Sequence, residues 1–165
     1  YPDDHYGLAK NIIAREILAH NGNIINLRLF GCFGKHEKDT RLISSAIMHT
    51  SVPRPIVIDQ NKKMDFCYVG DVIKVLDFIL EEPIIEYRDI NMCYKGKWTL
   101  QQIAELITSL IDNHKGITIK NIAPGLSYTG MNTRLTALGL DLIGLRGGIL
   151  EMLKSKRVPF NYQPF

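Results

Sequence analysis

The stretch Tyr6-Gly7-Leu8-Ala9-Lys10, with the residues that follow it up to Gly34, decides the fold of this 165-residue chain. Tyr6 and Lys10 are four residues apart at the start of an apolar pattern with helical spacing. The pattern predicts a helix over residues 6–20 that carries both side chains on one face. Asn21-Gly22-Asn23 ends this helix, and the apolar residues 24–29 predict a buried strand of a parallel sheet. Helix and strand together favour an α/β fold.

The Tyr6–Lys10 pair suits acid/base chemistry. A phenol ordinarily has a pKa of about 10 and exchanges protons poorly at neutral pH, whereas a nearby ammonium stabilises the phenolate. Tyr6 would then be the acid/base and Lys10 its electrostatic partner. The motif also arises by chance, and in that alternative Tyr6 is an aromatic at a helix start and Lys10 a solvated charge. The sequence after Lys10 is needed to distinguish an acid/base pair from a chance match.

The composition is that of one ordinary globular domain, with 45% hydrophobic and 22% charged residues. The net charge is +3 and the basic residues are scattered, so nucleic-acid binding is not indicated. Cys32, Cys67 and Cys93 are odd in number and far apart, which favours a reduced compartment and buried thiols. The histidines lack metal-ligand spacing, so we expect no metal. Without a signal peptide or a membrane-length apolar run, we expect a cytoplasmic protein that does not contact a membrane.

The remaining sequence predicts further alternating strands and helices. Asp71 and Thr99 are expected to cap helices over residues 72–80 and 100–111, and Asp39 or Thr40 to cap one that ends near Thr50. Gly147-Gly148 should weaken a last helix over residues 149–154. A small helix is expected over residues 135–138, strands over residues 56–58, 64–69, 88–92 and 117–119, and a turn over residues 59–62.

Four blocks of sequence, in this order, resemble the second half of an extended short-chain dehydrogenase/reductase. Tyr6 to Lys10 matches the Y-x-x-x-K of the NAD-dependent epimerase/dehydratase family, which acts on nucleotide sugars. Residues 27–34, Leu-Arg-Leu-Phe-Gly-Cys-Phe-Gly, resemble its R-x-F-N-x-Y-G. Residues 63–72, Lys-Met-Asp-Phe-Cys-Tyr-Val-Gly-Asp-Val, resemble its R-D-F-x-x-V-x-D-V. Asn91 with the Thr99 helix resembles its Asn-then-helix segment.

The resemblance implies part of a Rossmann-like doubly wound sheet plus the smaller α/β substrate-binding domain. Residues 1–34 would be a remnant of the dinucleotide-binding domain, and residues 35–165 mainly the substrate domain with interleaved Rossmann elements. Tyr6 would be the acid/base and Lys10 would bind the nicotinamide ribose of NAD or NADP. Phe30 would seat the nicotinamide end through its main chain. The reaction implied is hydride transfer between the cofactor and a sugar carbon.

Two residues depart from the family pattern on the substrate side. Gly31 stands where the family has an Asn, and Met64 aligns with the Arg that meets the substrate diphosphate. Lys62 or Lys63 could supply the positive charge instead, although a lysine lacks the two-pronged grip of an arginine. The alternative is that these are two exposed lysines in a turn.

The sequence contains no G-x-x-G-x-x-G loop, and it begins at Tyr1 without an initiator Met. We therefore expect the C-terminal portion of an NAD(P)-dependent nucleotide-sugar epimerase, dehydratase or reductase that is inactive on its own. The alternatives are a non-catalytic module of the same ancestry that binds a nucleotide sugar or a partner, and an unrelated α/β domain. Strand 24–29 would lack neighbours and expose apolar surface, which favours self-association. The resemblance implies a homodimer formed through the Tyr6 helix.

Overall fold

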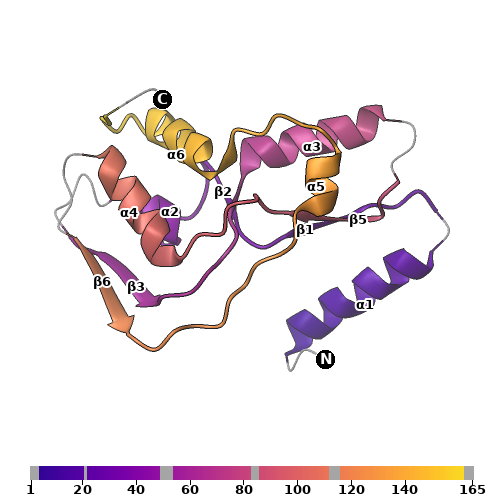
Figure 1. Ribbon diagram of the computed structural model, residues 1–165, viewed down its shortest axis with the longest axis horizontal. Helices are drawn as coiled ribbons and strands as arrows, with labels where there is room; N and C mark the ends of the chain where they lie inside the picture. The colour runs from indigo at the N-terminus through magenta and orange to yellow at the C-terminus, as the bar shows by residue number, and fades with distance from the viewer. Residues whose placement is uncertain (1–3, 21, 49–53, 83–85, 112–115, 162–165) are drawn as a thin grey trace.

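The computed structural model describes residues 4–20, 22–48, 54–82, 86–111 and 116–161. Strands alternate with helices along these residues (Figure 1). The elements are α1 (His5–Ala19), β1 (Asn26–Leu29), β2 (Cys32–Phe33), α2 (Leu42–Met48), β3 (Ile56–Gln60), β4 (Cys67–Tyr68), α3 (Val69–Glu81), β5 (Asp89–Met92), α4 (Leu100–Leu110), β6 (Ile117–Asn121), α5 (Thr133–Ala137) and α6 (Gly144–Ser155).

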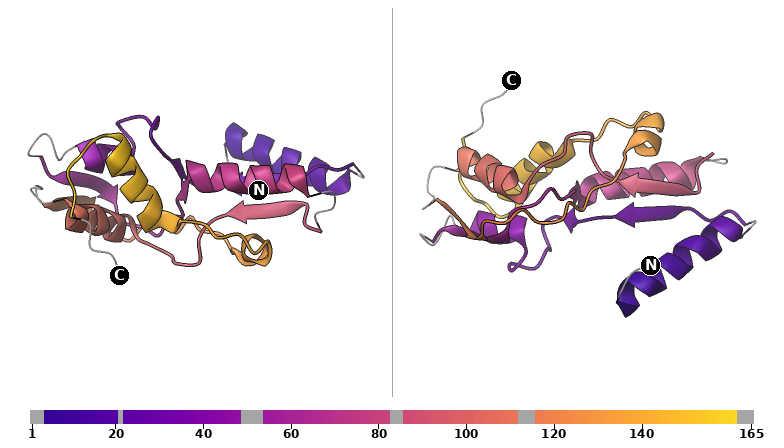
Figure 2. Two further views of the ribbon diagram at one scale, coloured as in Figure 1. Left: turned by 90° about the horizontal axis from the view of Figure 1, so that it is seen from above. Right: turned by 60° about the horizontal axis from the view of Figure 1, so that its bottom comes forward.

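The described strands form three parallel pairs, β1 with β5, β2 with β4, and β3 with β6. Parallel pairs need crossover connections, which the helices provide. The β1–β5 layer has α3 on one face and α1 on the other (Figures 1 and 2). One core packs α2, α4 and α6 around β3, and a second packs α3 and α5 around β5. The predicted α/β fold class is confirmed.

Local signals set the ends of two helices. The Asp4 carboxylate accepts a hydrogen bond of 2.6 Å from the Gly7 amide and so caps α1. Thr99 and Gln102 form a capping box at the start of α4, as predicted for Thr99. The predicted end of the second helix near Thr50 lies outside the described residues.

Three predictions of local structure are wrong. Asp71 does not cap α3, because that helix begins at Val69 and Asp71 lies inside its first turn. The residues 59–62 are not all turn, since β3 continues to Gln60 in register with β6. The predicted strand 64–69 shortens to β4, because α3 already begins at Val69.

The last helix is longer than predicted. It begins at Gly144 and runs through Gly147 and Gly148, the expected weak point. Leu145, Ile149 and Met152 on this helix are buried in the larger core. Tertiary packing therefore outweighs the low helix propensity of glycine.

Candidate functional site

Tyr6 and Lys10 lie one turn apart on α1, and their side chains are adjacent. The Lys10 Nζ lies over the Tyr6 ring, 5.4 Å from its centroid. Both residues line one cavity of about 620 Å³, which we call the Tyr6 cavity. The Tyr6 side chain is open to solvent, with 74% of the residue exposed. The phenol and the ammonium therefore share one face of α1, as their spacing predicted, and both border this cavity.

The opposite wall of the Tyr6 cavity is the strand β1 and the residue that follows it. Phe30 lines the cavity at the carboxyl end of β1, so Tyr6, Lys10 and Phe30 meet in one place. In open α/β sheets, ligands bind at the carboxyl ends of strands. The Phe30 ring lies edge-on to Tyr128, with 5.1 Å between the ring centroids.

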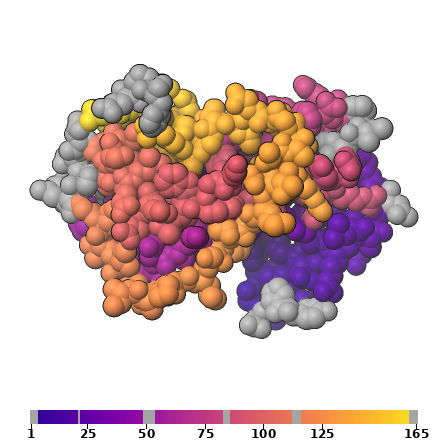
Figure 3. Space-filling model, in the orientation of Figure 1, coloured from indigo at the N-terminus to yellow at the C-terminus, as the bar shows by residue number. Residues whose placement is uncertain are grey.

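Tyr128 is a site residue that the sequence did not reveal. It lies between β6 and α5, far along the chain from Tyr6, yet it lines the same cavity. Figure 3 shows an orange surface, from the chain around residue 125, that crosses the front of the molecule and borders the indigo surface of the N-terminal part of the chain. No sequence motif identifies Tyr128, because it reaches the cavity only through the way in which the irregular segment between β6 and α5 folds back on the molecule.

Gly31 is buried and has no room for a side chain. A Cβ at this position would lie 2.9 Å from the Phe66 Cδ1 and 3.1 Å from the Asp65 carbonyl oxygen. The Gly31 carbonyl accepts a hydrogen bond of 2.7 Å from the Cys67 amide. The asparagine found here in the family would therefore require a local rearrangement.

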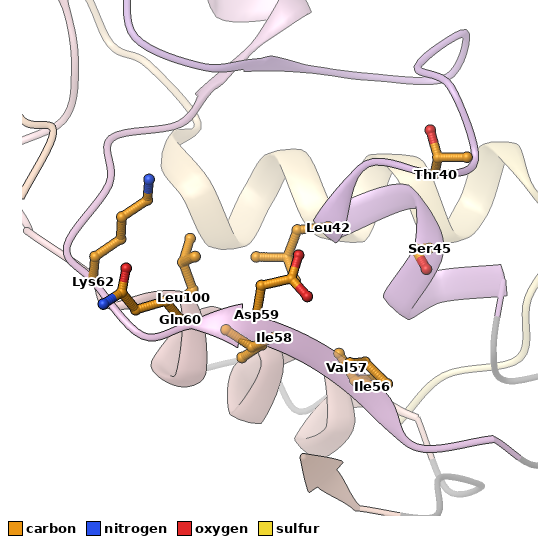
Figure 4. A pocket seen from close by; sticks show the side chains of 10 residues that line it. All are labelled: Thr40, Leu42, Ser45, Ile56, Val57, Ile58, Asp59, Gln60, Lys62 and Leu100. Atoms are coloured by element: carbon orange, nitrogen blue, oxygen red, sulfur yellow. The ribbon is translucent and has the colours of Figure 1, made fainter. Parts of the chain in front are cut away.

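Lys62 lines a second cavity, of about 400 Å³, which we call the Lys62 cavity (Figure 4). Apolar side chains from β3, α2 and α4 form part of its wall, among them Ile58, Leu42 and Leu100. The Lys62 cavity and the Tyr6 cavity share no lining residue. Lys63 lines neither cavity, and its backbone bridges to Thr99.

The polar side of β1 carries an arginine into the Tyr6 cavity. Arg28 lines the cavity and its guanidinium lies 2.7 Å from the Asp89 carboxylate. Asp89 also pairs with Arg134 at 3.2 Å and accepts a hydrogen bond of 3.2 Å from the side-chain amide of Asn26. This network holds the Arg28 charge at the wall of the cavity.

The buried thiols and phenols are held in their neutral forms. Burial raises the pKa of the Cys67 thiol to about 12 and raises the pKa of Cys93. Cys32 is only half-buried, which differs from the prediction, and burial again raises the pKa of its thiol. Burial also raises the pKa of Tyr94, whose hydroxyl donates to Asp71 at 2.5 Å. These residues are unsuited to act as nucleophiles or bases at neutral pH.

Among the residues that the structure describes, no group of three His, Cys, Asp or Glu side chains is placed to hold a metal ion. No helix in the same part of the chain is long and apolar enough to cross a membrane.

The parallel strands, the crossover helices and a cavity at the end of β1 define a Rossmann-like α/β protein. The model of the NAD dependent epimerase/dehydratase family matches residues 1–93. This match covers more than half of the 165 residues, and the chain belongs to that family. The family resemblance predicted from the sequence is confirmed. No match was found among curated protein sequences.

Solved structures of nucleotide-sugar enzymes share the fold. The Helicobacter pylori ADP-L-glycero-D-manno-heptose-6-epimerase is 20% identical, with a TM-score of 0.72 over 93% of this chain and 50% of that one. The Methanobrevibacter ruminantium UDP-N-acetylglucosamine 4-epimerase is 17% identical, with a TM-score of 0.72 over 93% and 55%. TunA, an NAD-dependent NDP-hexosamine 5,6-dehydratase of tunicamycin biosynthesis, is 14% identical, with a TM-score of 0.71 over 95% and 55%. The chain therefore spans about half the length of the structures it matches.

Proposed function

We propose that this chain supplies the acid/base residues and the sugar side of an NAD(P)-dependent nucleotide-sugar epimerase, dehydratase or reductase. One observation carries the proposal: Tyr6, Lys10 and Phe30 line the same cavity at the end of β1. Residues 1–34 would belong to the dinucleotide side of the protein, and residues 35–165 mainly to the substrate side.

The residues of the Tyr6 cavity suit the nicotinamide end of such a cofactor. The cavity of about 620 Å³ falls within the usual range of small-molecule sites, about 300–1,000 Å³. The ammonium of Lys10 can bind ribose hydroxyls, and Phe30, the residue after β1, lines the same cavity. When bound, NAD or NADP supplies the hydride chemistry. The sequence has no glycine-rich loop for the pyrophosphate, so we expect these 165 residues alone to bind the dinucleotide weakly.

The proton transfer would belong to Tyr6. When a sugar carbon is oxidised, the Tyr6 phenolate takes the proton of the hydroxyl group on that carbon. When the carbon is reduced, the Tyr6 phenol returns a proton to the oxygen on that carbon. Lys10, whose charge lies over the ring, would stabilise the phenolate that is present before the oxidation and after the reduction. Tyr128 forms the outer wall against which the sugar would lie, since aromatic faces suit the apolar side of a sugar ring.

The nucleotide would occupy the Lys62 cavity. Its wall combines apolar side chains, the Asp59 carboxylate and, at one end, the Lys62 ammonium (Figure 4). The apolar side chains suit a base, and the ammonium suits a diphosphate. The backbone from Lys62 to Met64 leads from this cavity to Tyr128, because Met64 and Tyr128 form a β-bridge. Lys63 is the other candidate for the charge.

The second candidate function is a non-catalytic module that binds a nucleotide sugar or a protein partner. The packing at Gly31 favours it, because a side chain there would clash with Phe66 and the Asp65 backbone. A chain without the family asparagine, and with Met64 in place of the arginine, could keep the fold and lose the chemistry.

Kinetics of the native protein and its Tyr6→Phe variant distinguish the two functions. The phenol-to-phenyl change should lower kcat for a nucleotide sugar by about 10²–10⁴-fold and leave its Kd within about threefold, because only proton transfer is lost. The control is Tyr87→Phe, a phenol outside both cavities. An unchanged kcat in Tyr6→Phe contradicts the acid/base assignment. Nucleotide-sugar binding without turnover in the native protein supports the binding module.

A further inference from the structure

Residues 123–131, which we call the strap, run beside residues 61–65. The Gly125 amide donates to the Asn61 carbonyl at 2.8 Å. The Tyr128 amide donates to the Lys63 carbonyl at 2.8 Å, and the Asp65 amide donates to the Tyr128 carbonyl at 3.1 Å. The strap therefore connects the chain that follows the Lys62 cavity with the wall of the Tyr6 cavity.

An ion pair with a buried carboxylate holds the strap in place. Asp65 is 3% exposed, and its Oδ2 accepts from the Lys97 Nζ at 2.7 Å and from the Gly130 amide at 2.8 Å. The Lys97 Nζ also donates to the Tyr94 carbonyl at 3.0 Å. A buried carboxylate is stable only when such partners compensate for lost hydration, and the Lys97 ammonium and the Gly130 amide provide that compensation for Asp65.

The fastened point of the strap lies directly against the aromatic wall. A Cβ at Gly130 would lie 2.5 Å from the Phe30 Cζ, so the strap backbone touches the ring. Two residues earlier, Tyr128 holds its ring edge-on to Phe30. Both rings line the Tyr6 cavity, whereas Asp65 and Lys97 line neither cavity.

We propose that Asp65, paired with Lys97, is a positioning residue. Its carboxylate holds the strap against Phe30 and thereby sets where the rings of Phe30 and Tyr128 stand in the Tyr6 cavity. It does not touch the ligand. The effect on a sugar ligand rests on the proposed function, whereas the effect on the two rings does not.

Nuclear magnetic resonance of Asp65→Asn tests the first part without any ligand. The amide keeps the shape and an acceptor but removes the charge pair. We expect the nuclear Overhauser contacts between the Phe30 and Tyr128 rings to weaken and exchange of the Gly130 amide to become at least about tenfold faster. The amides of Ile103 and Ile107 in α4 should stay protected. Lys97→Met should behave in the same way, and it replaces Asp65→Asn if that variant does not fold.

Glu151→Gln is the matched control, because it breaks an exposed ion pair of 2.8 Å with Lys154 on α6. This variant should leave both readouts unchanged. A folded Asp65→Asn that keeps the ring contacts and the Gly130 protection overturns the proposal. Equal losses in Glu151→Gln also overturn it, since the effect is then not specific to the strap.

A titration with UDP-glucose tests the second part. The Kd of Asp65→Asn should rise about tenfold, against no change in Glu151→Gln. An unchanged Kd in a variant that has lost the ring contacts shows that Asp65 does not position the site. Failure of the wild-type chain to bind UDP-glucose counts against the proposed function, and the ring and exchange readouts still decide the role of Asp65.

Discussion

Glu37 is a residue whose charge the fold disfavours. Its side chain is 4% exposed, and burial raises the pKa of its carboxyl group in spite of the Arg41 Nε at 3.1 Å. Within the described part of the chain, neither of its side-chain oxygens has a hydrogen-bond partner. The native state therefore binds this proton more tightly than the unfolded chain does.

This difference predicts a pH dependence. A raised native pKa contributes stability that is complete below the unfolded value, about 4.3, and is lost as pH rises through the native value. Glu37→Gln removes that titration. The free energy of unfolding of the wild type, relative to Glu37→Gln, should therefore fall as the pH rises above about 4.3, as measured by urea denaturation. The prediction is contradicted if the difference in free energy of unfolding between the wild type and Glu37→Gln stays constant or grows as the pH rises. Glu151→Gln is the control, because it removes an exposed carboxylate.

Single residues were predictable where the helix spacing alone fixes them. Tyr6 and Lys10 share a face because they are four residues apart on α1. Lys62 and Tyr128 were not predictable as members of separate cavities, because their surroundings come from segments distant in the sequence. Their positions depend on tertiary packing that no motif records.

At the level of the element, the start of α4 depends on Thr99. Its hydroxyl accepts a hydrogen bond of 3.1 Å from the Gln102 amide, and the Gln102 side chain accepts one of 2.8 Å from the Thr99 amide. Thr99→Ala should lower the free energy of unfolding by about 1 kcal/mol, measured by urea denaturation. Thr108→Ala, at a half-buried position inside the same helix, should have a smaller effect. Equal effects would show that the cap does not stabilise α4.

Helices and strands were predicted correctly where their sequence signals are local. Predictions were wrong where a residue distant in the sequence decides which role a side chain takes. The Thr99 cap and the apolar stripe with helical spacing predicted α4 correctly. Asp71 carries the same cap signal, but its carboxylate accepts from the amides of Ile143 and Gly144, at 3.0 and 3.1 Å, and so anchors the start of α6. A short polar side chain can serve either role, and the sequence does not reveal its partner.

At the scale of the whole molecule, α1 has no buried residue. Ile12 and Ile13 are 51% and 52% exposed, and apolar side chains in such a position favour association. We therefore predict that the chain self-associates through α1, as a dimer. Light scattering should give the mass of a dimer for the wild type and of a monomer for Ile12→Glu/Ile13→Glu. A wild type that stays monomeric at high concentration contradicts this prediction.

The 165-residue chain should bind a nucleotide sugar without binding the cofactor tightly. Residues of this chain line the Lys62 cavity and form the strap, whereas the sequence has no glycine-rich loop for a pyrophosphate. NADH should therefore not bind the 165-residue chain at micromolar concentration, as measured by calorimetry. A micromolar Kd would show that these residues build a dinucleotide site without that loop.

The most direct test of the account is the position of the Tyr6 hydroxyl in a crystal structure of the native protein with NAD and a nucleotide sugar bound. We predict that the Tyr6 oxygen lies within about 2.6–3.2 Å of the oxygen on the reacting sugar carbon, with Lys10 at the nicotinamide ribose. A Tyr6 hydroxyl that points to solvent, with the sugar bound elsewhere, would contradict it.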